Sequence, residues 1–257
     1  MKALLFAVFA IALCCPVYAQ QKDTISAKTN FQEPEQKINL LKKQNPCVLR
    51  ITFETNYGNI TLYEPFGLIA DLTPIRPDKS DSIFFCIPAA YTSKDTTIDG
   101  LYFCNGIRAR SAFNNKLTGA CYFKDESFNI IPSAEIDSAL ISFIQERKMN
   151  FFQQSLLVHH SGIYPCTLFK EKKNMRRALV KLNGNMFVAE SVDPLRIVDF
   201  QQALLEIGVT DAIYLDMGTW SEGWYKNNNC QYIRIGEKFQ NTHLQTNWLI
   251  FKVLQER

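Results

Sequence analysis

Apolar residues recur along this chain in short runs that are separated by turn residues. Residues 47–53 alternate between apolar and polar side chains as a half-buried strand does, and residues 60–63 follow a Tyr-Gly-Asn turn as its hairpin partner. Asn183-Gly184 joins two further runs and predicts a second hairpin. The other predicted strands are 83–87, 101–104, 120–123, 155–159, 178–182, 186–189, 212–215, 231–235 and 248–254.

Two segments instead have the spacing of an α-helix. Apolar residues recur with helical period in 134–148, and Ser133 is predicted to cap this helix. The second helix is predicted to have Asp193 as its N-cap and Pro194 as its first residue, with Gly208 just beyond its last turn. The pattern as a whole predicts an α+β fold: a single domain with a large, mostly antiparallel sheet system and two main helices.

The amino-terminal end of the sequence has a different pattern. An uninterrupted apolar run at 3–13 follows the basic Lys2, and Ala19 closes a small-x-small sequence that is typical of a cleavage site. Residues 1–19 are therefore predicted to be a secretory signal peptide. The protein is expected to be exported, either to the periplasm or out of the cell.

Cys14 and Cys15 raise the alternative that the chain carries lipid on a cysteine. Leu13 is larger than the residue that such a site prefers, so simple cleavage is the favoured interpretation. Residues 20–45 are polar and are predicted to be a flexible leader, which leaves 46–257 as the folded domain. No stretch of 18 consecutive apolar residues follows the signal, so no transmembrane segment is predicted.

Composition and charge exclude several classes of protein. Hydrophobic residues make up 47% of the 257 residues and charged residues 21%, as in globular proteins and unlike disordered ones. A formal net charge of +3 supplies no basic surface for nucleic acid, so no nucleic-acid partner is predicted. Three histidines are too few to favour a multi-histidine metal site. No metal or other cofactor is therefore predicted, although a divalent cation near Asp216 is left open, as is the oligomeric state.

Cysteine usage is compatible with export but does not predict a disulfide framework. No Cys-x-x-Cys pair occurs, and each cysteine lies in or beside an apolar run, where a free thiol packs as a small hydrophobic group. We therefore expect no disulfide or a single one. The six cysteines that follow the signal peptide are Cys47, Cys86, Cys104, Cys121, Cys166 and Cys230.

An acidic residue, Asp216, stands directly after the apolar strand predicted at 212–215. A carboxylate at the mouth of a buried strand costs free energy unless it is paired or used. Together with Glu222 it can supply the two carboxylates that glycoside hydrolysis requires, one as the acid and one as the base or nucleophile. The alternative is that Asp216 caps a turn.

The residues after Asp216 have the character of a sugar-binding segment. Trp220 and Trp224 offer flat aromatic faces on which the apolar face of a sugar ring can pack. Gly218 allows the backbone to approach a ligand closely, and Ser221 lies between the two tryptophans and is counted with the same segment. The alternative is that the tryptophans belong to the core.

Asparagine and arginine residues lie beside two more predicted strands. Asn105 and Gly106 form a turn directly after a buried strand, and Arg108 follows them. Arg176 and Arg177 precede another apolar strand. A planar guanidinium group binds anionic oxygens such as those of phosphate, so these residues are candidate substrate contacts. The alternative is that the arginines are ordinary surface charges.

Other catalytic motifs are weakly supported. His159 and His160 end a predicted strand and are interpreted as structural, because no acidic residue lies near them in the sequence. The chain has no Gly-x-Ser-x-Gly motif and no phosphate-binding glycine loop. Serine hydrolases and nucleotide-binding proteins are therefore disfavoured.

Four segments together resemble the phosphodiester glycosidase family. Residues 101–106 form a strand that ends in Asn-Gly, and 154–163 begin with Gln-Ser and continue into an apolar strand and a turn. Residues 176–179 read Arg-Arg-Ala-Leu at a strand start. The most specific segment is 199–216, which runs from a helix through Ile-Gly-Val-Thr-Asp-Ala into a strand that ends in Leu-Asp. The resemblance covers about 85–225.

The resemblance implies an exported glycan hydrolase that cleaves a sugar phosphodiester, releases the sugar and exposes a phosphomonoester. Asn105, Arg176 and Asp216 fall on the family's functional positions, and the implied partner is an anionic or phosphorylated glycan. Met217 stands where the family has a glycine. This departure keeps an alternative open, a non-catalytic envelope protein that binds a glycan or a partner on the same fold. A purely structural envelope protein is a third possibility.

Overall fold

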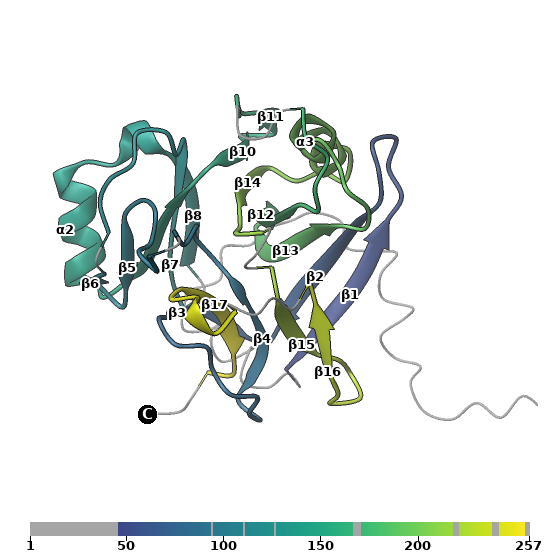
Figure 1. Ribbon diagram of the computed structural model, residues 1–257, viewed down its shortest axis with the longest axis horizontal. Coiled ribbons are helices and arrows are strands. Elements are labelled where there is room, and N and C mark those ends of the chain that lie inside the picture. The colour runs from purple at the N-terminus through teal and green to yellow at the C-terminus, as the bar shows by residue number, and fades with distance from the viewer. Residues whose placement is uncertain are drawn as a thin grey trace, which may run out of the picture. The chain divides into compact units, whose positions relative to one another are not determined.

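The structure of this chain is a computed structural model, drawn in Figure 1. The residues that it describes lie within one compact unit, Ile38–Arg257. They are residues 46–254, except for 94, 110, 126, 167–170, 218–220 and 238–241.

The described residues form three antiparallel sheets, of which the first has seven strands. Their order is β1 (Cys47–Phe53), β2 (Ile60–Phe66), β13 (Asn185–Ser191), β12 (Arg177–Leu182), β14 (Asp211–Tyr214), β10 (Leu156–His159) and β11 (Gly162–Ile163). The β1–β2 and β12–β13 hairpins that the sequence predicts are both present, with Ile51 opposite Leu62 and Leu179 opposite Val188.

The other two sheets have five strands each. The second has the order β16 (Tyr232–Ile235), β15 (Gly223–Lys226), β4 (Ile83–Pro88), β17 (Trp248–Lys252) and β3 (Ile69–Thr73). The third has the order β6 (Ile107–Arg108), β5 (Tyr102–Cys104), β9 (Asn150–Gln154), β7 (Gly119–Lys124) and β8 (Ser127–Pro132).

Two α-helices cover the outer faces of sheets. Helix α3 (Ile197–Glu206) buries Phe200, Ala203 and Leu204 in one hydrophobic cluster with Ala178 and Val180 of β12. Helix α2 (Ser138–Glu146) buries Ile144 against Phe103 and Phe151 of the third sheet, and Figure 1 shows it beside β5 and β6. Short 3₁₀ turns occur at η1 (Ser133–Glu135) and η3 (Thr242–Leu244).

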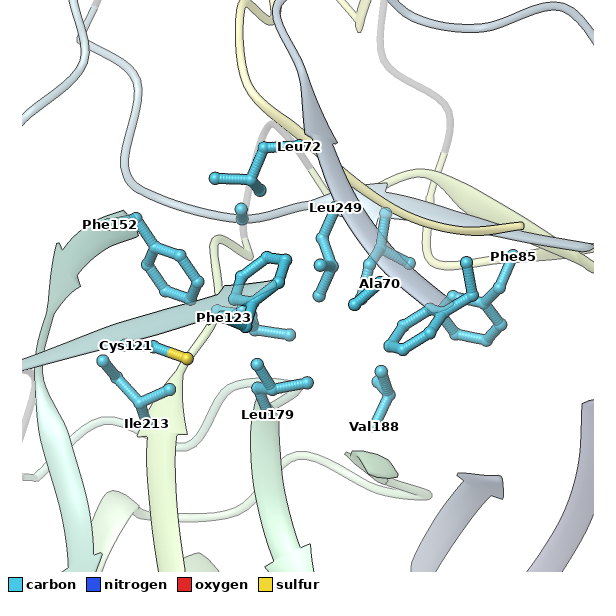
Figure 2. Close-up of a cluster of buried hydrophobic side chains, with 14 of the residues drawn as sticks. Ala70, Leu72, Phe85, Cys121, Phe123, Phe152, Leu179, Val188, Ile213 and Leu249 are labelled. Atoms are coloured by element: carbon cyan, nitrogen blue, oxygen red, sulfur yellow. The ribbon is translucent and has the colours of Figure 1, made fainter. Parts of the chain in front are cut away.

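A single hydrophobic cluster joins the three sheets, as Figure 2 shows. Leu179, Val188 and Ile213 project into it from the first sheet. The second sheet contributes Ala70, Leu72, Phe85 and Leu249, and the third contributes Cys121, Phe123 and Phe152. Because alternate residues of a strand face opposite sides, β12 serves both this cluster and the one under α3.

The predicted α+β class is wrong, although the strands are mostly antiparallel as expected. The structure is 45% strand and 13% helix and has three sheets, which makes it a mainly β protein. The prediction lacks strands β3, β6, β8, β9, β11 and β15. Strand β9 shows the reason: its sequence is Asn-Phe-Phe-Gln-Gln, and all five side chains are buried although three of them are polar.

Both helices begin later than predicted. Helix α2 is capped by Asp137, whose carboxylate accepts the Leu140 N–H at 2.7 Å, because the Ser133 hydroxyl donates instead to Leu117 O. In α3 the helix begins at Ile197, since the backbone of Leu195 pairs with Asn174 and is held extended.

Other predictions for these helices and for the cysteines are confirmed. Gly208 follows α3 with a φ of +89°, the left-handed conformation that terminates helices. All six cysteines that follow residue 45 are free thiols. In the part of the chain that the structure describes, no helix combines the length and apolar character needed to cross a membrane.

Candidate active site

Strand β14 delivers Asp216 to the place where the first two sheets meet. The Leu215 N–H donates to Arg177 O at 3.0 Å and continues the pairing with β12. The Asp216 N–H then donates to Ala89 O at 2.8 Å, just beyond the end of β4. Asp216 is 2% exposed at this junction. Its position directly after a buried strand is therefore as predicted.

The surroundings of the Asp216 carboxyl favour its neutral form. Burial raises the pKa of Asp216 well above its ordinary value. The Thr92 N–H, which donates to Oδ2 at 3.4 Å, the Gln245 amide, the Met217 N–H and the positive charge of Arg177 oppose this rise. The effect of burial is the largest, so the group keeps its proton at a higher pH than an exposed aspartate does.

Arg177 is fully buried and binds Glu190 across the β12–β13 hairpin. Its Nε and Nη2 atoms lie 3.1 and 3.0 Å from Glu190 Oε2, and Nη1 donates to Ser221 O at 3.0 Å. The guanidinium group therefore ties the segment before β15 to the first sheet. The sequence analysis did not identify Glu190 as a partner of Arg177. The feature that could have indicated it is an acidic residue at the end of an apolar strand.

Arg176 is also buried, and it binds a different set of groups. It donates from Nε to Leu195 O at 2.9 Å, from Nη2 to Lys172 O at 2.6 Å and from Nη1 to the Tyr214 hydroxyl at 3.4 Å. The interpretation of Arg176 and Arg177 as surface charges is therefore wrong. Both are buried donors that hold loops and strands in place through protein acceptors.

Glu222 and Trp224 face an outer cluster of the second sheet. Both carboxylate oxygens of Glu222 bind Arg76, at 3.2 and 3.3 Å, and the Arg76 guanidinium lies over the Trp248 ring at 5.3 Å. Trp224 is 2% exposed and meets the Tyr232 ring edge to face at 5.1 Å. Trp224 is thus a core residue, as the alternative interpretation held, and Glu222 is a buried carboxylate in an ion pair with the half-buried Arg76.

The remaining members of the predicted sugar-binding segment have mixed outcomes. The Ser221 hydroxyl accepts the Glu237 N–H at 3.1 Å, while its carbonyl binds Arg177. Gly218 and Trp220 lie outside the described residues.

Asn105, Gly106 and Arg108 lie on the third sheet, in the β5–β6 hairpin. Asn105 is exposed and donates its N–H to Asn150 Oδ1 at 3.0 Å. Gly106 has a φ of +78°, and a Cβ there would lie 2.8 Å from Gln145 O at the end of α2. Figure 1 shows this hairpin beside α2. Asn105 bonds to Asn150 of the third sheet, whereas Asp216 bonds to Ala89 and Thr92, so their hydrogen bonds give the two residues no common partner.

A hollow of about 520 Å³, which we call the 93–115 hollow, opens between two surface segments. Six of its ten lining residues carry polar side chains, and Phe113 adds an aromatic ring that is 49% exposed. Arg108 reaches its wall, where Nη2 donates to Ser111 O at 3.0 Å. The lining residues are Ser93, Thr97, Ile98, Asp99, Gly100, Ser111, Ala112, Phe113, Asn114 and Asn115.

Thr92 links the 93–115 hollow to Asp216. Thr92 donates its N–H to the Asp216 carboxyl, pairs with Ile98 of the hollow in an isolated bridge and is followed by Ser93 in the wall. The sequence analysis missed this hollow, because loops 91–100 and 109–116 show no periodic pattern.

No cluster of metal ligands surrounds Asp216 in the described part of the chain. The group of potential ligands in this part of the chain lies at the opposite end of β14. It consists of His159, His160 and Asp211. The residues around Asp216 in the described part of the chain therefore give no support to a divalent cation there.

Comparison with known proteins gives a likeness of fold. The chain matches none of the protein-family models and none of the curated proteins against which it was compared. It is similar in structure to the catalytic domain of zebrafish N-acetylglucosamine-1-phosphodiester alpha-N-acetylglucosaminidase, auto-inhibited by its pro-peptide. That match has a TM-score of 0.54 and 11% identity over 82% of this chain and 83% of that one.

A second solved structure is a hypothetical protein from Synechocystis, with a TM-score of 0.52 and 10% identity. The match covers 80% of this chain and 62% of that chain. At such low identities the likeness concerns the fold alone. The chain therefore shares, at a distance, the fold of a phosphodiester glycosidase catalytic domain.

Proposed function

We propose that this chain is an exported hydrolase that cleaves the glycosidic bond of a sugar phosphodiester, with Asp216 as the proton donor. The observation that carries the proposal is the buried Asp216 carboxyl with its raised pKa, at the end of β14 on a glycosidase-like fold. A general acid must hold its proton near the working pH and give it to the leaving oxygen. Burial in a low-dielectric site is a known way to keep a carboxyl group protonated for this purpose.

The 93–115 hollow supports the proposal as the place where the glycan binds. Sugar rings pack on exposed aromatic faces such as that of Phe113, and their hydroxyl groups bond to side chains such as those of Asp99 and Asn115. Arg108 is exposed at the wall and presents a guanidinium group to a phosphate oxygen. Arg176 and Arg177 then act by holding the site together.

The proposal requires contact between Asp216 and the substrate. Asp216 is 2% exposed, so the segment that contains Thr92 has to yield when a glycan occupies the hollow. The 3.4 Å hydrogen bond from Thr92 is a long one and is the contact that would open.

A second function, glycan binding without turnover, is favoured by one observation. The second expected carboxylate, Glu222, is held by both of its oxygens in the ion pair with Arg76. A lone buried acid without a free carboxylate partner fits a binding protein that has kept the fold.

A hydrolysis assay separates the two functions. The full chain is incubated with a panel of sugar-1-phosphodiesters, beginning with an N-acetylglucosamine-1-phosphodiester, and free sugar is measured. The hydrolase predicts turnover that Asp216→Asn abolishes and that Asp193→Asn, a change of an exposed carboxylate, preserves. Binding of the panel by the wild-type chain without sugar release establishes the second function instead.

A further inference from the structure

We propose that His159, His160 and Asp211 form a binding site for a divalent transition metal such as Zn²⁺. One ligand atom from each of the three side chains lies within 4.8 Å of the other two. The site is independent of the proposed hydrolase function, because Asp211 begins β14 whereas Asp216 follows its end.

The sheet itself brings the three residues together. Strand β10 ends at His159, and β14 begins at Asp211 beside it, with Val158 opposite Ala212 in the antiparallel register. His159 Nδ1 lies 3.0 Å from Asp211 Oδ1. His159 and Asp211 are 52 positions apart, which explains why no acidic partner for the histidines was found near them in the sequence.

A tight turn between β10 and β11 places His160 next to His159 and Asp211. His160 and Ser161 connect β10 to β11 and have φ values of 49° and 60°, a left-handed pair that Asn-Gly usually occupies. The Ser161 N–H donates to Thr210 O at 2.8 Å, and the His160 N–H donates to Asp211 Oδ1 at 3.2 Å. These bonds fix the turn against the start of β14.

The donor types suit a metal of the zinc class. Imidazole nitrogen and carboxylate oxygen are both zinc ligands, and three protein ligands leave the fourth tetrahedral position for water or another molecule. The two imidazole rings are stacked at 3.8 Å, so their nitrogens lie close to one another. His159 and Asp211 are mostly buried, with side chains 17% and 13% exposed, whereas His160 opens to solvent.

The carboxylate is already oriented before any metal binds. Oδ1 of Asp211 accepts the His160 backbone N–H at 3.2 Å and lies 3.0 Å from the His159 Nδ1. No described residue donates to Oδ2, which leaves that oxygen for the ion. Such prior orientation of a ligand by hydrogen bonds strengthens metal sites.

Zinc binding to the full chain tests the proposal. The protein is treated with a chelator, dialysed and titrated with ZnCl₂ in a calorimeter, with its thermal midpoint recorded in parallel. We expect one zinc per chain and a rise in Tm on saturation. His160→Ala and Asp211→Asn are each expected to weaken binding by at least ~10-fold and to remove the rise in Tm.

Matched controls separate this site from adventitious binding. His243→Ala removes the third histidine of the chain and Cys230→Ser removes an exposed thiol, and both variants should bind zinc as the wild type does. Because His160 is exposed, its replacement should leave the circular dichroism spectrum unchanged. The proposal is wrong if the wild type binds no zinc, or if His160→Ala binds it with wild-type affinity.

Discussion

The peptide N–H of Asp216 donates to the carbonyl oxygen of Ala89 at 2.8 Å, just beyond the ends of β14 and β4. This bond links the first sheet to the second at the residue on which the proposed chemistry depends. The Arg177 guanidinium makes a second link there through Ser221 O at 3.0 Å. Asp216 is therefore held through bonds to both sheets, and the proposed function requires the Thr92 segment to move when a glycan binds.

The pH dependence of stability should reveal the raised pKa of Asp216. In the folded state the carboxyl binds its proton more tightly than in the unfolded chain, where the pKa is about 3.9. Its contribution to the free energy of unfolding is thus full below that pH and is lost as the pH rises through the folded-state pKa. Asp216→Asn lacks this dependence. Urea unfolding of both proteins from pH 3 to pH 8 should show the wild type losing stability relative to the variant, and a constant difference would contradict the assignment.

The buried ion pair between Arg177 and Glu190 should be costly to break. Arg177→Met leaves the Glu190 carboxylate buried without its partner, for which we expect a loss of about 3–5 kcal/mol in the free energy of unfolding. Adding Glu190→Met should restore much of that loss. Arg196→Met removes the exposed pair with Asp199 and serves as the control, with an expected loss much smaller than that of Arg177→Met. Equal losses for the two arginine variants would exclude a special role for the buried pair.

The close approach of β15 to β4 should make Gly223 intolerant of a side chain. A Cβ at Gly223 would overlap the carbonyl oxygen of Cys86, so Gly223→Ala is expected to lower the free energy of unfolding by about 3 kcal/mol. Gly162→Ala places its Cβ 3.4 Å from the nearest atom and should change it by less than about 0.5 kcal/mol. Chemical denaturation measures both.

Phe113 should contribute to glycan binding without contributing to stability. Its ring is 49% exposed in the 93–115 hollow, so Phe113→Ala should weaken glycan binding about 10-fold, the loss of roughly 1.4 kcal/mol that an aromatic contact supplies. Phe143→Ala removes a ring that is 44% exposed on α2 and provides the matched control. Calorimetric titration with the glycan panel compares them. Identical affinities for the two variants would place the glycan elsewhere.

The sequence predicted the strands with regular alternation and missed those whose burial depends on distant partners. Residues 47–53 coincide with β1 because apolar and polar positions alternate there. Strand β15 lies within the predicted sugar-binding segment, because nothing in the local sequence around Trp224 indicates the β4 strand that pairs with it. Strand β9 was missed for a similar reason, because its buried polar side chains hide the apolar pattern of a strand. The Gln153 amide forms hydrogen bonds with backbone groups more than 35 residues away in the sequence.

Prediction of the site was limited by contacts between separate sheets. Asp216 could be predicted as a site residue because an aspartate that directly follows an apolar strand is a pattern visible in the local sequence. Asn105 ends a strand in the same way, yet its strand belongs to another sheet, and sequence spacing does not tell the two cases apart. The partnership of His159 with Asp211 likewise exists only through the pairing of β10 with β14.

The most direct test of the account is the pH profile of kcat/KM for sugar release from a sugar-1-phosphodiester, measured for the wild type and Asp216→Asn. A proton donor predicts that the wild-type rate falls on the alkaline side as Asp216 loses its proton. It also predicts that Asp216→Asn is slower by at least ~100-fold at the pH values where the wild-type Asp216 keeps its proton, while its Tm at acidic pH stays near that of the wild type. Turnover by Asp216→Asn at the wild-type rate would contradict the central claim.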